Sequence, residues 1–230
     1  MNDLAEKLLI LRAKVASNGR LALLAAFPLE SLPGTWDLVV SAPWITARKK
    51  QALDILITEL RTIFVTDLLP FSKIVTPEPA EDFVLAIARE WRPSTAATTV
   101  RDGPSVAVGD AGVVVEARDY YAELLRPAFP DGADLQSLPK HGNLWIRVSW
   151  KLGTDPNRPN KSSKIIQVKI SEEALHDYLY SSDFASVEEV MFQFVSTKVR
   201  SFIPEHDSPY GSTPPVEEWK VRTKLFQAAG

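Results

Sequence analysis

The stretch from Lys140 to Leu152 reads KHGNLWIRVSWKL, in which apolar and polar side chains alternate. Successive side chains of a β-strand point to opposite faces of its sheet, so this alternation predicts a strand with one core face and one solvent face. The predicted core face carries Leu144, Ile146, Val148, Trp150 and Leu152, and the predicted outer face carries Trp145, Arg147, Ser149 and Lys151.

A second stretch with the same alternation follows this one. Its side chains are predicted to point inward at Ile166, Val168 and Ile170, and outward at Ile165, Gln167 and Lys169. Residues 153–163 between the two stretches are turn formers, and Pro156 and Pro159 cannot join a hydrogen-bonded ladder. We therefore predict a two-stranded ribbon over residues 140–169, called the basic ribbon below.

The basic ribbon differs in charge from the rest of the chain. It holds seven Lys or Arg residues and one acid, Asp155, so it carries +6, whereas the whole chain carries −3 and the remainder −9. A basic island on an acidic protein attracts anions locally. Trp145 beside Arg147 and Lys151 also offers a stacking surface of the kind that single-stranded nucleic acid uses. The alternative is a solvated sheet face whose lysines discourage edge-to-edge aggregation.

The leading hypothesis is therefore a non-enzymatic binding module that engages nucleic acid or an acidic protein surface. Arg147, Lys151 and Lys169 would contact phosphates and Trp145 would stack, while Arg158 and Lys161 in the connecting loop would add reach. His141 is a candidate anion contact or acid–base group. The candidate binding residues are Lys140, His141, Trp145, Arg147, Lys151, Arg158, Lys161, Lys164 and Lys169.

The wider pattern predicts an α+β fold built on a mixed sheet. Trp36–Val40 and Phe71–Val75 are predicted strands, joined by a helix whose apolar stripe includes Leu53, Leu56 and Leu60, and a further helix follows Pro79. This is a β-α-β-α unit, in which the strands usually pair in parallel. Two β-hairpins are predicted, one around residues 109–112 and one in the basic ribbon. Residues 127–139 are predicted to be a loop, and C-terminal helices capped by Ser171 and by Ser186 with Glu189 pack on the sheet.

One globular domain is predicted over residues 1–204, with a lobe boundary at 92–104 where the chain is polar and contains prolines. Residues 205–230 are predicted to be a proline-containing linker and a C-terminal amphipathic segment. The pattern leaves open whether residues 216–226 form a helix or a strand, and whether they pack on their own domain or on a second subunit in a homo-oligomer or complex.

Several classes of function lack their markers. The chain has no cysteine, no phosphate-binding glycine motif and no Gly-x-Ser-x-Gly elbow, and its three histidines are widely spaced. These features predict neither a metal site nor a cofactor. Asp3 and Glu6 are unlike the basic start of a signal peptide, and the most apolar run, Leu21 to Leu29, is too short to span a bilayer. We therefore expect a cytoplasmic protein without a membrane partner.

One enzymatic alternative is a metal-dependent phosphodiesterase or nuclease. Asp102, Asp110 and Glu116 lie around a valine-rich strand, where carboxylates could hold Mg²⁺ against a phosphodiester, with Arg118 nearby. The pattern loosely resembles the Asp…Glu-x-Lys arrangement of restriction-type nucleases, with Arg118 in the lysine position, and does not identify the chain as a member of that family. Arginine cannot lose its proton, which argues against a role as a base. A second alternative is a structural subunit of a larger assembly.

Overall fold

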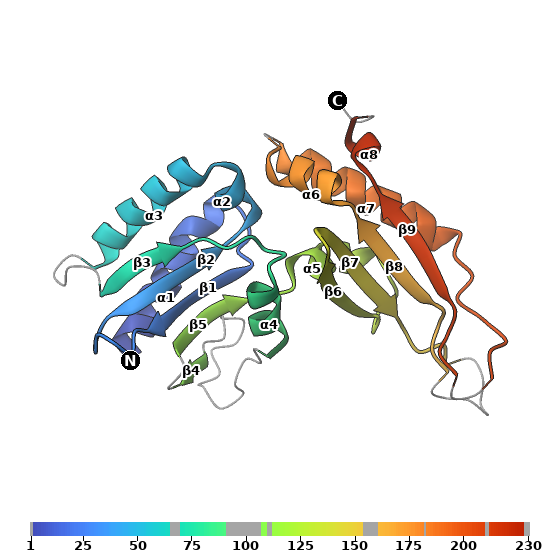
Figure 1. Cartoon of the computed structure of the whole chain (residues 1–230), viewed down its shortest axis with the longest axis horizontal. Coiled ribbons are helices and arrows are strands. Elements are labelled where there is room, and N and C mark those ends of the chain that lie inside the picture. Colours follow the sequence, from blue (N-terminus) through green and yellow to red (C-terminus); the bar gives the residue numbers. More distant parts are fainter. Residues whose placement is uncertain are drawn as a thin grey trace. The chain divides into compact units, whose positions relative to one another are not determined.

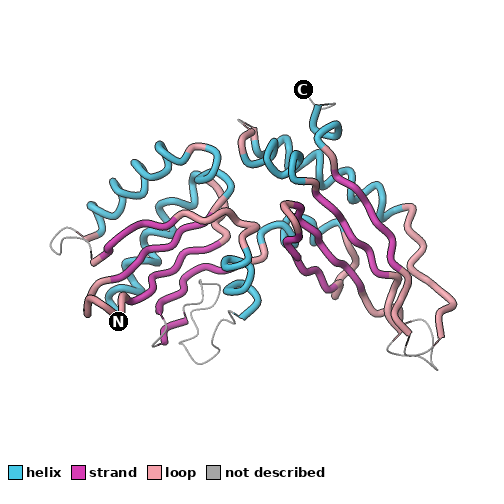
Figure 2. Tube along the Cα trace, in the orientation of Figure 1, coloured by secondary structure: helices cyan, strands magenta, loops and turns pink. Residues whose placement is uncertain are grey.

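A computed structural model of the chain describes residues 2–64, 70–90, 107–109, 112–153, 161–181, 183–209 and 212–227. The contacts between Cα atoms divide the chain into two compact units, Met1–Tyr120 and Tyr121–Gly230. Each unit contains its own β-sheet and its own helices (Figures 1 and 2). The predicted α+β class is confirmed, but the strands form two sheets rather than the single mixed sheet that we expected.

The first unit is built on a sheet with the strand order β3-β2-β1-β5-β4. Strands β2 and β3 pair in parallel, and the other neighbours are antiparallel. Its elements are α1 (Asn2–Val15), η1 (Ala16–Asn18), β1 (Leu23–Pro28), β2 (Trp36–Ser41), α2 (Pro43–Ala47), α3 (Lys49–Ile63), β3 (Phe71–Val75), α4 (Asp82–Glu90), β4 (Ala107–Gly109) and β5 (Gly112–Ala117). The predicted β-α-β-α unit is thus confirmed as β2, α3, β3 and α4, and the first predicted hairpin as β4 and β5.

Helices α1 and α3 pack against each other, and α1 also packs on β1 and β5. The stripe of α3 buries Ala52, Leu56 and Leu60, because residues three to four positions apart share one face of a helix. Leu23 to Ala26 of β1 are fully buried, as expected for a central strand that is covered on both faces.

The second unit is built on a sheet with the order β6-β7-β8-β9, in which only β8 and β9 are parallel. Its elements are α5 (Tyr120–Leu125), η2 (Arg126–Ala128), β6 (Asp134–Lys140), β7 (Asn143–Ser149), β8 (Ile165–Ile170), α6 (Glu172–Leu179), α7 (Phe184–Arg200), β9 (Val216–Val221) and α8 (Thr223–Gln227). Helix α6 packs on β7, and α6 and α7 both contact α8.

The basic ribbon is confirmed as β7 and β8, with Leu144 opposite Ile170 and Val148 opposite Ile166. The predicted inward side chains are buried at Leu144, Ile146, Val148, Ile166, Val168 and Ile170, whereas Trp150 and Leu152 follow the end of β7 and are only half-buried. Ile165, which we predicted to point to solvent, is buried as well. It lies on an inner strand, where it pairs with Val216 of β9, a neighbour that the ribbon alone did not reveal.

The loop predicted over residues 127–139 is wrong in its second half, where Asp134–Lys140 form β6. Pro139 is tolerated because β6 is an edge strand, whose outward groups need no partner. His141 (φ 51°) and Gly142 (φ 75°) form the two-residue connection to β7, and two positive φ angles in succession are typical of a tight hairpin turn.

The C-terminal segment is both a strand and a helix, β9 followed by α8. Strand β9 pairs along its whole length with β8, so the segment packs on its own unit. Trp219 of β9 stacks on Phe129 at 6.3 Å between ring centroids, and Phe202 meets the same tryptophan edge-on at 5.7 Å. The predicted lobe boundary at 92–104 lies outside the described residues, and the predicted division at residue 204 stays a prediction. Within the described residues, no helix is long and apolar enough to cross a bilayer.

The helix caps are confirmed at one of two predicted positions. The Ser171 hydroxyl accepts a hydrogen bond from the Ala174 N–H at 3.3 Å, as predicted for the start of α6. The predicted cap at Ser186 is wrong, because α7 starts earlier and Asp183 caps it by accepting from the Ser186 N–H at 3.1 Å. That backbone hydrogen bond, followed by one from the Ser186 side chain, lowers the pKa of Asp183.

We expect Ser171→Ala to lower the free energy of unfolding by about 1 kcal/mol, because it removes the acceptor for an N–H that has no partner within the helix. Urea denaturation followed by circular dichroism measures the change. Ser31→Ala, at an exposed position between β1 and β2, is the matched control. An equal loss in both variants would contradict the assignment of the cap.

We also expect the stabilising charge of Asp183 to be lost at acid pH. Its folded-state pKa lies below the unfolded value, so its contribution is complete above the unfolded pKa and disappears as the pH falls through the folded pKa. Asn caps helices well but carries no charge. The difference in urea midpoint between the wild type and Asp183→Asn should therefore narrow from neutral pH to a pH of about 3. A constant difference would contradict the prediction.

Candidate anion-binding surface

The sheet of the second unit has one face, called the outer face, that points away from its aromatic core. Because β-strands alternate, this face carries the residues between the buried ones. They include Gln136, Leu138 and Lys140 of β6, Trp145 and Arg147 of β7, Gln167 and Lys169 of β8, and Glu218 and Lys220 of β9.

The strand register arranges these side chains in two rows across the sheet. One row runs Leu138, Trp145, Lys169 and Lys220, and the other runs Gln136, Arg147, Gln167 and Glu218. Side chains that are directly opposite on neighbouring strands lie about 5 Å apart at their Cβ atoms, and diagonal ones about 7–8 Å apart. Arg147 and Lys169 occupy diagonal positions, so cations from two inner strands lie close together.

Lys169 and Lys220 are direct neighbours in the register, an arrangement in which like charges repel. The Lys169 ammonium lies 5.1 Å from the centroid of the Trp145 ring, on the side away from β9. The Lys220 ammonium instead lies 3.6 Å from a carboxylate oxygen of Glu218 on its own strand. Each lysine thus has a local partner, and a bound anion between them would reduce their mutual repulsion.

Most of the remaining predicted cations on this side are exposed. Lys140, His141, Arg147 and Lys151 are exposed, and within the described residues none of them forms an ion pair. One acid acts on Lys169 from α6. The pKa of Glu173 is lowered, chiefly by its backbone hydrogen bond and the Ser171 hydroxyl and also by the charge of Lys169.

Two predicted contacts, Lys164 and Lys161, are placed differently from Arg147. The Lys164 ammonium lies 5.9 Å from the Phe202 ring centroid, beside the aromatic core on the opposite side of the sheet, so its predicted anion contact stays a prediction and would be separate from the outer face. Lys161 is half-buried and precedes the first residue of β8, next to the bridge between Lys151 and Ser162. Arg158 lies outside the described residues.

The prediction omitted Lys220, Gln136 and Gln167, which complete the two rows. Gln167 was predicted to point outward but carried no charge to mark it. Lys220 was missed because a parallel strand is joined to its neighbour by a long connection, so no local turn signal reveals the pairing. The alternation of Trp219 and Val221 with charged residues was the available signal.

Trp145 offers a stacking surface only in part. Its side chain is half-buried, and its indole Nε1 is buried without a hydrogen-bond partner among the described residues. Lys169 already lies over the ring. A nucleic-acid base could therefore stack on this ring only after displacing that ammonium.

The geometry does not favour the metal-dependent alternative. Glu116 is buried, and its two carboxylate oxygens are bound separately, one by the Arg12 guanidinium from α1 and one by that of Arg118. A divalent ion would have to displace both arginines. Asp102 and Asp110 lie outside the described residues, and the described part of the chain contains no cluster of three potential metal ligands.

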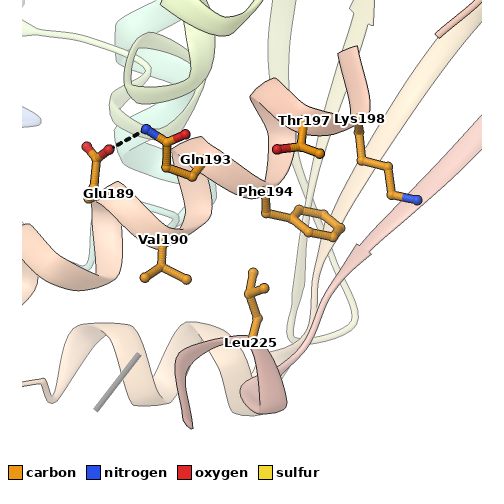
Figure 3. Close-up of a pocket in the computed structure, with 7 residues that line it drawn as sticks. All are labelled: Glu189, Val190, Gln193, Phe194, Thr197, Lys198 and Leu225. Carbon is orange, nitrogen blue, oxygen red and sulfur yellow. Dashed lines mark hydrogen bonds between the residues drawn. The ribbon is translucent and has the colours of Figure 1, made fainter. Parts of the chain in front are cut away.

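A groove of about 450 Å³ lies between α7 and α8 (Figure 3). Val190 and Phe194 of α7 and Leu225 of α8 form its apolar walls, and Gln193 donates a hydrogen bond to Glu189 at its rim, at 2.5 Å. Its lining contains no histidine, cysteine or clustered acids. The groove thus provides a mainly apolar surface, with Glu189, Thr197 and Lys198 among its lining residues.

Comparison with protein-family models, curated proteins and solved structures finds no match for this chain.

We expect Glu116→Gln to destabilise the first unit by about 2–3 kcal/mol, because it leaves two arginines without their carboxylate partner. The expected loss is at or below the usual range for breaking a buried ion pair, because both arginines are partly exposed. The exposed fraction of the side chain is 31% for Arg12 and 24% for Arg118. Thermal and urea unfolding measure the loss. Lys73→Met, which removes the more exposed pair with Asp37, is the control and should cost well under half as much. Unchanged stability in Glu116→Gln would contradict the structural role.

Proposed function

We propose that this protein is a binding module that engages an anionic macromolecule, most concretely nucleic acid, through the outer face of its second sheet. One observation carries the proposal: Lys169 and Lys220 are directly opposite on neighbouring strands, with Arg147 on the diagonal. Placing like charges together costs stability in the free protein. Phosphate oxygens that accept hydrogen bonds from both lysines would remove this repulsion and add a favourable interaction.

Arg147 is the strongest candidate for direct phosphate contact. It is exposed, it lies on an inner strand whose backbone is hydrogen-bonded on both sides, and no described acid pairs with it. Its planar guanidinium can hold two phosphate oxygens at once. Lys140 and Lys151, near the two ends of the ribbon, would extend the contact along the strand direction.

Trp145 and Lys169 together would distinguish single-stranded from double-stranded ligands. An unpaired base can stack on the Trp145 ring, which is worth roughly 1–3 kcal/mol per base, and the displaced Lys169 ammonium can then meet the adjoining phosphate. A duplex keeps its bases stacked on one another and offers only its backbone. An acidic protein would use the same cations without the tryptophan.

The acidic charge of the whole chain fits a local contact surface. A net charge of −3 opposes general adhesion to nucleic acid, so binding has to depend on the few cations of the outer face. Binding through those cations releases counterions and must weaken as salt rises.

The test is fluorescence anisotropy of labelled single-stranded and duplex oligonucleotides, titrated with protein at two salt concentrations. Wild-type binding should be salt-sensitive, and Arg147→Glu should weaken it on the order of tenfold and flatten its salt dependence. Trp145→Ala should weaken the single strand more than the duplex. Lys50→Glu, an equal change of charge at an exposed position of α3, is the control and should leave binding unchanged.

No binding at low salt would overturn the nucleic-acid proposal. Equal losses in Arg147→Glu and Lys50→Glu would show that net charge, rather than this face, governs the association. Oligonucleotide binding that responds to Arg147→Glu but not to Trp145→Ala would show contact with the phosphate backbone alone and would overturn the stacking role of Trp145. The titrations are run with Mg²⁺ and with EDTA, and cleavage that requires Mg²⁺ would support the nuclease alternative instead.

A further inference from the structure

Strand β9 presents an edge of backbone groups to solvent. It is the last strand of its sheet, next to β8 only (Figure 1). The Pro215 carbonyl accepts a hydrogen bond from the Ile165 N–H at 2.8 Å, and the Val221 carbonyl accepts one from the Ser171 N–H at 3.2 Å. Backbone groups alternate in direction along a strand, so the odd-numbered residues face β8.

The even-numbered residues Val216, Glu218 and Lys220 therefore direct their N–H and C=O groups away from the sheet. No backbone hydrogen bond from the described residues reaches these groups. The three side chains are exposed as well. An edge of this kind can pair with another strand.

We propose that β9 pairs in antiparallel fashion with β9 of a second copy of this chain, about a two-fold axis that passes beside Trp219. Residues that exchange hydrogen bonds across such a pair must both come from the even-numbered set. With the axis at Trp219, Glu218 lies opposite Lys220 of the partner subunit, and Lys220 lies opposite Glu218 of the partner subunit. Opposite charges in directly opposed positions stabilise a sheet.

The charges select this register over its neighbours. An axis at Glu218 would set that residue opposite Glu218 of the partner subunit, and an axis at Lys220 would set two lysines together. Lysines at a sheet edge usually prevent pairing through repulsion. With the axis at Trp219, each lysine lies opposite a glutamate of the other subunit. The charge pattern therefore favours this register and disfavours those in which the axis is moved by one residue.

The pairing would place the two outer faces on the same side of one continuous sheet, because a two-fold axis perpendicular to a sheet preserves its faces. A single strand pair is small beside the interfaces of permanent dimers, so self-association should depend on protein concentration. Lys220 belongs to both surfaces, but this inference does not rest on the proposed function, because it is argued from the open edge of β9 and its test contains no anionic ligand.

Sedimentation equilibrium of the full chain over a wide concentration range tests the proposal. The wild type should dimerise, and either Glu218→Lys or Lys220→Glu alone should weaken the dimer on the order of tenfold through like charges in both opposed positions. The double variant Glu218→Lys/Lys220→Glu should restore it, because the complementary pattern is only exchanged.

A mixture gives the sharper measurement. The Glu218→Lys chain carries lysine at both positions and the Lys220→Glu chain carries glutamate at both, so each single variant repels itself and attracts the other. With one variant labelled, the mixed dimer should form preferentially over either homodimer. An effect on folding within one chain would not produce this preference.

Lys220→Pro provides a backbone test. Its N–H faces the open edge, so proline there removes no bond to β8 and should leave the circular dichroism unchanged. It should abolish the dimer. A wild type that stays monomeric at all concentrations, a dimer insensitive to the charge exchanges, or a mixture without preference would each overturn the proposal.

Discussion

The parallel pairing of β8 with β9 is the constraint on which the second unit depends. This pairing gives β8 a second neighbour, as β6 does for β7, so both strands of the basic ribbon lie inside a four-stranded sheet. It also brings Trp219 into contact with Phe129 and Phe202, so one strand supplies both a backbone ladder and a large part of the aromatic core. The same register sets Lys220 beside Lys169. Packing on one face thus determines the charge pattern on the other.

The two units differ in whether their charged groups have buried or exposed partners. Glu116 in the first unit is buried and has a guanidinium on each oxygen, so its charge is already compensated within the fold. The cations of the outer face have partners that a ligand can displace: an aromatic ring for Lys169 and an exposed glutamate for Lys220. Displacing an exposed pair costs little, whereas breaking a buried one costs several kcal/mol. These differences favour the second unit as the site of the binding that we propose.

Local patterns were enough to predict the elements whose signals lie within one stretch of chain. The alternation in residues 144–152 predicted β7, and the stripe of α3 predicted the helix between β2 and β3. Strand β6 was missed because Pro139 suggested a loop, although an edge strand accepts proline. The position of Lys220 could not be predicted, since it follows from a pairing between segments about fifty residues apart in the sequence.

Protection of sheet edges explains only some of the lysines. Lys140 and Lys220 lie on the edge strands β6 and β9, where charge discourages unwanted pairing. Arg147 and Lys169 lie on the inner strands β7 and β8, which have no free edge to protect. Inner positions on a solvated face tolerate any polar residue, so two cations on the diagonal, with a third directly beside one of them, are not required by the fold. The anion binding that we propose across β7 and β8 would account for the inner pair, and the proposed symmetric pairing of β9 would account for the alternation of Glu218 and Lys220 at the edge.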